Sequence, residues 1–236
     1  MVSFETVPLS NELLWFIMLT VNFVMILLSY RLFGKTGLFI WTPIAVIIAN
    51  IQVLKAVDLF GFSATLGNIV YASSFLVTDI LSENYGRADA RKAVYIGFLS
   101  LFAMTVLMQL ALVFTPSGSD FAHQSLAVIF GIMPRIALGS LAAYGLSQMH
   151  DVWAYQFWKK IKPDKKHIWI RNNFSTMVSQ LIDTAVFTVI AFAGVFEGRM
   201  FWEIMATTYL FKLIVAALDT PFLYIARSWK DRGRIL

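Results

Sequence analysis

The sequence predicts an all-α integral membrane protein, a single polytopic domain over residues 1–236 built as a bundle of about seven transmembrane helices. Three observations predict this class. Of the 236 residues, 58% are hydrophobic, and the mean hydropathy is +0.71. Only 14% are charged, whereas a soluble domain carries about 25%. A water-exposed surface could not be built from this composition, so no separate soluble domain is expected.

Seven apolar runs are long enough to cross a bilayer, which takes roughly 20 helical residues. They lie at about residues 12–33, 38–59, 64–84, 92–114, 126–150, 173–196 and 201–226. The first run is interpreted as a retained helix, because no basic segment of a signal peptide precedes it. The third and fifth runs contain charged groups, so their hydropathy is lower. Pro43, Pro134 and Pro221 lie inside predicted helices, where each removes one backbone hydrogen bond.

The lysines and arginines fall mostly on one of the two sides that seven helices would create. With the N-terminus outside, fifteen of the nineteen lie in inner segments, and the outer segments hold only Arg199. The inner ones are Arg31, Lys35, Arg87, Arg91, Lys92, Lys159, Lys160, Lys162, Lys165, Lys166, Arg171, Arg227, Lys230, Arg232 and Arg234. Because cytoplasmic loops are enriched in basic residues, this bias predicts a cytoplasmic C-terminus. It also predicts a cytoplasmic loop at about residues 158–171 and a cytoplasmic tail at about 227–236.

Six helices are possible only if the first run lies on the membrane surface, and it has too few polar residues for that position. The same topology explains the net charge of +5, so no nucleic-acid partner is expected, and the lipid bilayer is the expected environment.

The sequence gives no sign of a metal, a cofactor or an enzyme active site. There is no cysteine, and the three histidines do not stand at ligand spacing. No Walker loop, dinucleotide-binding loop or nucleophile elbow occurs, which excludes an ATPase on this chain. An intramembrane enzyme that uses Asp79 and Asp183 as acid and base is a minor alternative.

Polar residues inside the predicted helices are the main clue to function. A charge in the bilayer core costs about 2.5–3.5 kcal/mol on insertion scales, so such groups usually face an interior cavity. Seven lie deep within the predicted helices, namely Asn50, Lys55, Asp79, Arg135, Gln180, Asp183 and Lys212. Five others lie near predicted helix ends, where capping and loop pairing explain them: Asp58, Glu83, Asp151, Asn172 and Asn173. The alternative for the deep group is internal ion pairing that only fixes the bundle, for example between Arg135 and Asp183.

Three stretches together resemble a known family. The first contains Ala49-Asn50, Lys55 and Gly61, and the second contains Gly67, Tyr71 and the run from Asp79 to Arg87. The third contains Arg135, Ser147-Gln148, Asp151, the run from Trp169 to Thr176, Ser179-Gln180, Asp183-Thr184 and Phe187. From about residue 45 to 225 the chain resembles the vitamin uptake transporter family, specifically the bacterial queuosine precursor transporters.

The resemblance implies import of the cyano and aminomethyl 7-deazaguanines across the bacterial inner membrane, for salvage into modified tRNA. It also implies a helical bundle similar to the substrate-binding components of energy-coupling-factor transporters.

The deep polar residues suit such a purine-like substrate. A carboxylate accepts the two donors of a deazaguanine, and an amide or a cation satisfies its carbonyl oxygen. Asp183 or Asp79 could take the first role, and Gln180, Asn50, Arg135 or Lys55 the second. Lys212 is a further candidate for substrate binding. Tyr71 and Trp41 are candidates to stack on the ring. Asp79 or Glu83 could carry a coupled proton or act in gating.

Two further points stay open on the sequence alone. The chain could be a binding subunit for another small vitamin that works with an external ATPase module, or uptake could be passive and drawn by metabolic trapping. Small residues at four-residue spacing, such as Gly139 and Ala143, would then dock that module. A homo-oligomer also stays open.

Overall fold

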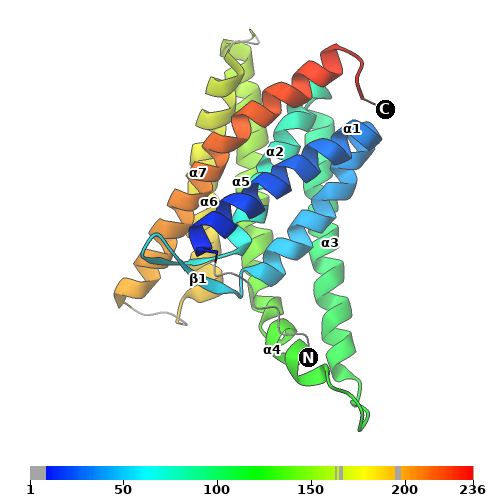
Figure 1. Cartoon of the computed structure of the whole chain (residues 1–236), viewed down its shortest axis with the longest axis vertical. Helices are drawn as coiled ribbons and strands as arrows, with labels where there is room; N and C mark the ends of the chain where they lie inside the picture. The colour runs from blue at the N-terminus through cyan, green and yellow to red at the C-terminus, as the bar shows by residue number, and fades with distance from the viewer. Residues whose placement is uncertain (1–8, 163, 165–166, 195–197, 236) are drawn as a thin grey trace.

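The computed structural model describes residues 9–162, 164, 167–194 and 198–235, without the side chains of residues 171, 172 and 200. The helices of these ranges are α1 (Asn11–Gln52), α2 (Gly67–Asn84), α3 (Arg87–Val113), α4 (His123–Gly131), α5 (Met133–Ile161), α6 (Ile168–Phe192) and α7 (Gly198–Asp231). One antiparallel hairpin, β1 (Ala56–Leu59) with β2 (Phe62–Thr65), joins α1 to α2. Helices α3, α5 and α6 run roughly along the long axis of the molecule, and α7 and the N-terminal arm of α1 lie obliquely to it (Figure 1).

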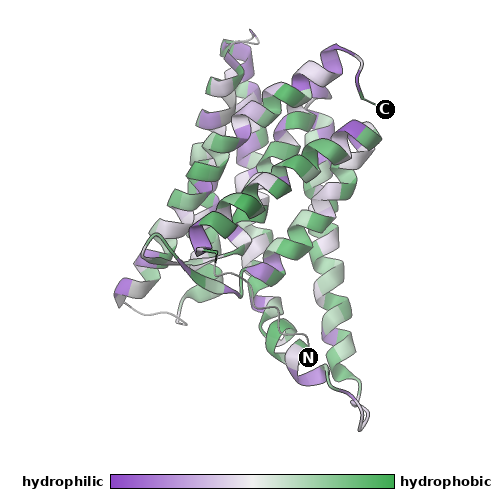
Figure 2. Cartoon of the chain, viewed as in Figure 1, coloured by the Kyte–Doolittle hydropathy of each residue, from purple (hydrophilic) through white to green (hydrophobic). Residues whose placement is uncertain are grey.

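Within these ranges, five helical segments are long and apolar enough to cross a membrane: α1, α3, the combined α4 and α5, α6, and most of α7. Many large apolar side chains on the outer faces are exposed, among them Leu107 and Val113 of α3 at 64% and 81%. Hydrophobic residues accordingly cover long stretches of the outer helices in Figure 2. Contiguous exposed apolar surface of this kind is typical of a lipid-facing exterior, so the chain is a multi-pass membrane protein.

Helix α2 forms the centre of the bundle. Of its 18 residues, all except Tyr71 are buried, although its polar residues keep its hydropathy low. It contacts α1, α3, α5 and α7. A helix surrounded on all sides by other helices needs no lipid-compatible face, which explains why it can carry two carboxylates.

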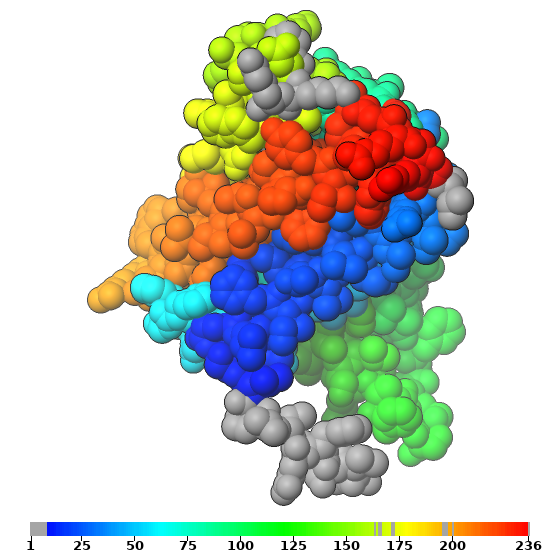
Figure 3. Space-filling view, turned by 45° about the horizontal axis from the view of Figure 1, so that its top comes forward, coloured from blue at the N-terminus to red at the C-terminus, as the bar shows by residue number. Residues whose placement is uncertain are grey.

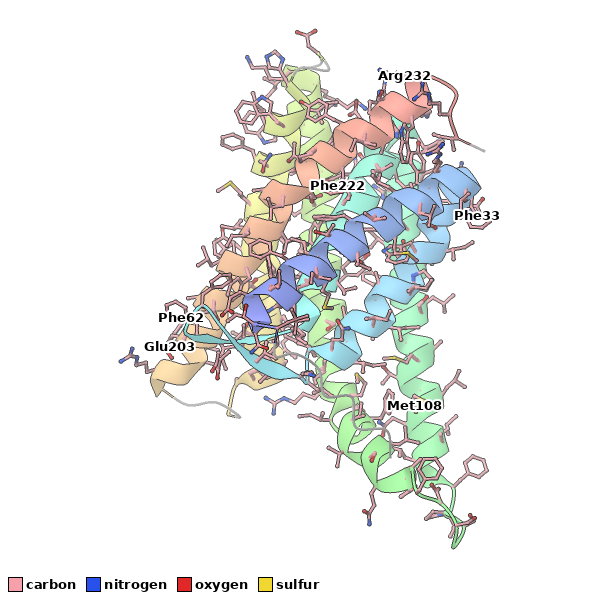
Figure 4. All side chains as sticks on the ribbon, in the orientation of Figure 1. Phe33, Phe62, Met108, Glu203, Phe222 and Arg232 are labelled. Carbon is pink, nitrogen blue, oxygen red and sulfur yellow. The ribbon has the colours of Figure 1, made fainter. Side chains whose placement is uncertain are left out.

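Helix α1 bends sharply at Gly34, whose φ of 56° and ψ of −138° are not helical. Glycine adopts this conformation without a steric penalty. At the bend Ser29 Oγ donates a hydrogen bond to the Gly37 carbonyl oxygen, at 2.9 Å. The two arms of α1, residues 11–33 and 35–52, correspond to the first two expected helices, and they diverge from the bend in Figure 1. Phe33 projects outward beside it (Figure 4).

The expectation of helices over 38–59 and 64–84 is wrong where the first should end and the second should begin. Helix α1 ends at Gln52, and the hairpin occupies the gap before α2. Phe60 and Gly61 form its turn with φ values of 54° and 80°. Asp58, expected at a helix end, lies in β1 and accepts a hydrogen bond from Ser63 Oγ at 2.9 Å. Hydropathy missed this change because the hairpin is itself rich in apolar residues.

The boundary between α5 and α6 also differs from expectation. Helix α5 continues to Ile161, so the first part of the expected loop at 158–171 is helical. Asp151, expected near a helix end, therefore lies well inside α5 and is fully buried. Lys165 and Lys166, and the side chains of Arg171 and Asn172, lie outside the described residues. Hydropathy locates a bilayer-spanning run, and it does not register a helix that continues beyond the bilayer.

Helices α4 and α5 meet at a break around Ile132, which places Pro134 in the first turn of α5. Proline is tolerated there because the N–H that it lacks would have no helical partner. Before α4, Asp120 accepts hydrogen bonds from the backbone N–H groups of Ala122 and His123, at 2.8 and 3.0 Å. These bonds hold the pKa of the Asp120 carboxyl below its usual value.

Helix α7 runs alongside the N-terminal arm of α1, and the two lie against each other in Figure 3. The rings of Phe23 and Phe222 meet between them with centroids 4.5 Å apart. The contact fixes α7 against α1 and thereby places the middle of α7 beside α2 and α6.

A side chain at Gly67 should destabilise the bundle. A Cβ there would meet the carbonyl oxygen of Ala49 and the backbone of Val53, and overpacking of this kind typically costs about 1–3 kcal/mol. We expect Gly67→Ala to lower the melting temperature of the purified protein in detergent. The matched control is Gly118→Ala, where the added Cβ has open space. Equal melting temperatures for the two variants would contradict the close approach.

Candidate functional site

A pocket lies where five helices converge around the N-terminal half of α2. It encloses about 310 Å³ of empty space, counting its open side. Its lining residues are Ala49, Asn50, Val53, Gly67, Asn68, Tyr71, Ser140, Asp183, Phe187 and Lys212. We call it the first pocket.

The strongest electrostatic feature of the first pocket is the ion pair between Asp183 of α6 and Lys212 of α7. Both side chains are almost completely buried, at 1% and 3% exposed. Lys212 Nζ donates to Asp183 Oδ2. The other carboxylate oxygen, Oδ1, accepts from Tyr71 Oη at 2.5 Å and from Ser147 Oγ at 3.1 Å. Four helices therefore contribute to one buried carboxylate.

The side chain of Tyr71 makes two contacts with this pair. Its hydroxyl bonds to Asp183, and its ring lies under the ammonium of Lys212, with 4.9 Å between Nζ and the ring centroid. Such a cation–π contact stabilises a desolvated cation. Tyr71 also lines the pocket, as does Phe187.

Two amide side chains, Asn50 and Asn68, also line the first pocket. Asn50 Nδ2 donates to the Val46 carbonyl oxygen at 2.8 Å, and Asn50 Oδ1 accepts from Ser140 Oγ at 2.6 Å. Asn68 Nδ2 donates to the hydroxyl oxygens of Thr65 and Thr208, at 3.1 and 3.4 Å. The pocket thus presents a carboxylate, an ammonium and two amides.

Gln180 lies three residues before Asp183 on α6 and is completely buried. Among the residues that the structure describes, neither its amide oxygen nor its amide nitrogen has a hydrogen-bond partner. It does not line the first pocket. Buried amides without partners are rare, and they usually bind water or a ligand.

A second polar group lies further along α2. Asp79 is buried, and its charge interacts with those of Asp151 of α5 and Asp219 of α7, which are buried as well. Within the described part of the chain, no lysine or arginine pairs with Asp79 or Asp151. Glu83, one turn beyond Asp79, differs from them. Its carboxylate accepts from Tyr155 Oη at 3.1 Å and pairs with Lys159 and Arg227 at 3.4 and 3.7 Å.

Two residues that were expected deep within helices, Lys55 and Arg135, are exposed instead. Lys55 is exposed just before the hairpin, where its carbonyl oxygen accepts from the Leu66 N–H at 3.1 Å. Arg135 is exposed in the first turn of α5 and donates to the carbonyl oxygens of Ile190 and Ala193, at 3.1 and 2.5 Å. It therefore caps the C-terminus of α6. The suggested pair between Arg135 and Asp183 is wrong, because Lys212 is the cation that reaches Asp183.

The structure thus brings Asn50, Tyr71, Asp183 and Lys212 together around one pocket. Asp79 lies outside it, Gln180 lies beside it, and Trp41 does not line it. Ser140, Ser147 and Asn68 were not assigned as site residues from the sequence. Serine in an apolar run gives a weak signal, because a single hydroxyl can bond to its own helix.

Across the described residues, no group of three or more histidine, aspartate or glutamate side chains could hold a metal ion.

The comparisons with known proteins agree with one another. Residues 65–226 match the family model described as "Putative vitamin uptake transporter". A "Probable queuosine precursor transporter" of Bacillus subtilis (strain 168) is 45% identical over 218 residues, which cover 92% of this chain and 95% of that protein. A protein of the same description from Haemophilus influenzae is 28% identical over 172 residues, 72% of this chain and 70% of its own length. No solved structure matches.

The ion pair at the first pocket leads to a stability prediction. Lys212→Met leaves the Asp183 carboxylate buried and unpaired, and Asp183→Asn does the same to the ammonium. Breaking a buried pair from one side costs about 3–5 kcal/mol. We expect each single variant to melt at a clearly lower temperature in detergent, and the double variant to recover much of the loss. Additive losses in the double variant would show that the two side chains do not depend on each other.

Proposed function

We propose that this chain, which belongs to the vitamin uptake transporter family, imports queuosine precursors across a bacterial inner membrane. The family match covers more than half of the chain, and the Bacillus subtilis relative aligns along nearly its whole length. The observation that carries the proposal is the first pocket, where a buried carboxylate, an ammonium, an amide and a tyrosine ring converge.

The proposed substrates are the cyano and aminomethyl 7-deazaguanines. Their N1–H and exocyclic amine are neighbouring donors, which one carboxylate can accept together. Asp183 is that carboxylate, and Lys212 or Asn50 donates to the carbonyl oxygen of the base. Each hydrogen bond to a charged group contributes roughly 1.5–3 kcal/mol. The ring of Tyr71 stacks on the base, which adds about 1–3 kcal/mol by analogy with nucleobases.

A ligand in this position has to compete with bonds that already exist. Tyr71, Ser147 and Lys212 all donate to Asp183. We infer that the base replaces one of these donors at Asp183, and that the displaced donor then bonds to the ligand. Among the described residues, the amide atoms of Gln180 on α6 have no partner, so a small shift of that helix would add its amide to the site.

The proposed topology has seven membrane crossings, with the N-terminus outside and the C-terminus in the cytoplasm. The two arms of α1 are about 35 and 27 Å long at 1.5 Å per residue, and α2 is about 27 Å long, close to the thickness of the hydrocarbon core. With α3, α5, α6 and α7 they make seven. The distribution of basic residues supports the orientation.

Energy coupling is a separate part of the proposal. We propose that Asp79 carries a coupled proton, because it is buried beside two other carboxylates and has no paired cation among the described residues. Glu83, with two basic partners and a tyrosine, instead belongs to an ion-pair network at the inner end.

The second candidate is a binding subunit for another small vitamin that works with an external ATPase module, as in energy-coupling-factor transporters. The exposed apolar outer faces of the helices favour it only in a general way, because lipid covers such faces equally well. Transport by the purified protein alone in liposomes distinguishes the two. A homo-oligomer is compatible with either candidate.

Loss of the carboxylate at the first pocket should abolish uptake. In cells that cannot make the precursor, Asp183→Asn should prevent salvage of supplied deazaguanines into tRNA, because the acceptor for both ring donors is lost. Gln180→Ala should reduce salvage as well. Lys55→Gln, which lies outside the pocket, is the control and should retain salvage. Normal salvage by both Asp183→Asn and Gln180→Ala, at normal protein levels, would rule out this site.

A proton gradient should drive uptake through Asp79. In proteoliposomes, an exterior more acidic than the lumen should accelerate uptake by the natural protein. The Asp79→Asn variant should transport at a rate independent of the gradient, because an amide does not bind and release a proton as a carboxylate does. If the natural protein shows no dependence on the gradient, uptake is passive or needs a partner.

A further inference from the structure

A second pocket lies between α3 and α5 and shares no lining residue with the first. It encloses about 590 Å³ of empty space, again counting its open side. Its wall includes Arg87, Arg91, Tyr95, Phe98, Gln148 and Met149. Arg87 and Arg91 stand four residues apart and share a face of α3.

A row of three aromatic rings connects the two pockets. Tyr71 lines the first pocket, and its ring centroid is 5.9 Å from that of Tyr144. The Tyr144 ring is in turn 5.3 Å from that of Phe98, which lines the second pocket. All three rings meet edge to face. We call Tyr71, Tyr144 and Phe98 the ring barrier.

Helix α5 also links the two pockets directly. Ser147 donates to Asp183 in the first pocket, and the next residue, Gln148, lines the second. Gln148 Oε1 accepts from Thr78, seven residues beyond Tyr71 on α2. Seven residues of helix rise about 10 Å, so the two pockets differ in depth by roughly the length of one planar bicyclic molecule.

Two polar atoms along this route have no partner among the described residues. They are Tyr144 Oη and Gln148 Nε2, and both side chains are buried, at 2% and 0% exposed. An unsatisfied buried polar atom is unfavourable, because it has lost its hydrogen bonds to water. Such atoms suit a path along which a polar molecule passes and forms the missing bonds for a short time.

We propose that the second pocket is the inner substrate site, from which the planar base leaves after it passes the ring barrier. Phe98 and Tyr95 provide stacking surfaces, and Gln148 and Arg91 donate to the carbonyl oxygen of the base. The inference rests on the proposed function, because it takes the substrate to be the same deazaguanine. It goes beyond that function in placing a second binding site and the barrier between the two.

The absence of cysteine from the natural chain makes a direct test possible. Met149→Cys places one thiol in the second pocket, and a bulky maleimide on it should obstruct the exit. We expect labelling to lower uptake into proteoliposomes by about tenfold or more, the effect of a barrier raised by about 1.4 kcal/mol. Equilibrium binding of deazaguanine to the first pocket should stay within about twofold, and added deazaguanine should slow the labelling.

Ser119→Cys, in the exposed segment between α3 and α4, is the matched control, and its labelling should leave uptake unchanged. Gln148→Met should lower uptake without weakening binding. Full uptake by labelled Met149→Cys would overturn the inference. A loss of binding as large as the loss of uptake would also overturn it. Protection of the thiol by anionic lipid but not by deazaguanine would assign the pocket to a lipid headgroup and also overturn it. Absence of any deazaguanine uptake by the natural protein would instead refute the proposed function.

Discussion

The ion pair between Asp183 and Lys212 is the interaction on which the arrangement of the bundle depends. In a bilayer neither charge can reach water, so each has to be neutralised inside the protein. The carboxylate gathers donors from three helices besides its own, namely Tyr71 of α2, Ser147 of α5 and Lys212 of α7. These four helices could not separate without leaving a charge or a hydroxyl unsatisfied in an apolar environment. The first pocket lies beside this junction.

The central position of α2 follows from the same constraint. Its polar residues would be costly against lipid, and the surrounding helices remove that cost by burying it almost completely. They also divide the interior into layers along the helix. Asn68 and Tyr71 lie at the first pocket, Asp79 lies among carboxylates, and Glu83 lies among basic residues at the far end. The first pocket, the buried carboxylates and the ion-pair network therefore succeed one another on a single helix.

The sequence was sufficient to predict the membrane class and four of the residues that line the first pocket. Asn50, Asp183 and Lys212 could be found because an isolated polar group in an apolar run is rarely tolerated without a partner or a ligand. The positions expected for Lys55 and Arg135 were wrong, because hydropathy cannot distinguish a helix interior from a short apolar hairpin or a helix end. The choice of Lys212 over Arg135 as partner of Asp183 depends on how α7 packs against α6. No spacing along the chain encodes that contact.

The bend of α1 at Gly34 bears on how the protein is assembled. A straight helix of 42 residues would be about 63 Å long, twice the hydrocarbon thickness. Because the chain reverses at Gly34, α1 can enter the membrane as a helical hairpin, with both arms inserted together during synthesis. Under the proposed topology this reversal makes α1 cross the membrane twice, which determines the side on which every later loop lies. If α1 crossed only once, every later loop would face the opposite side, and the basic segments would have to be translocated.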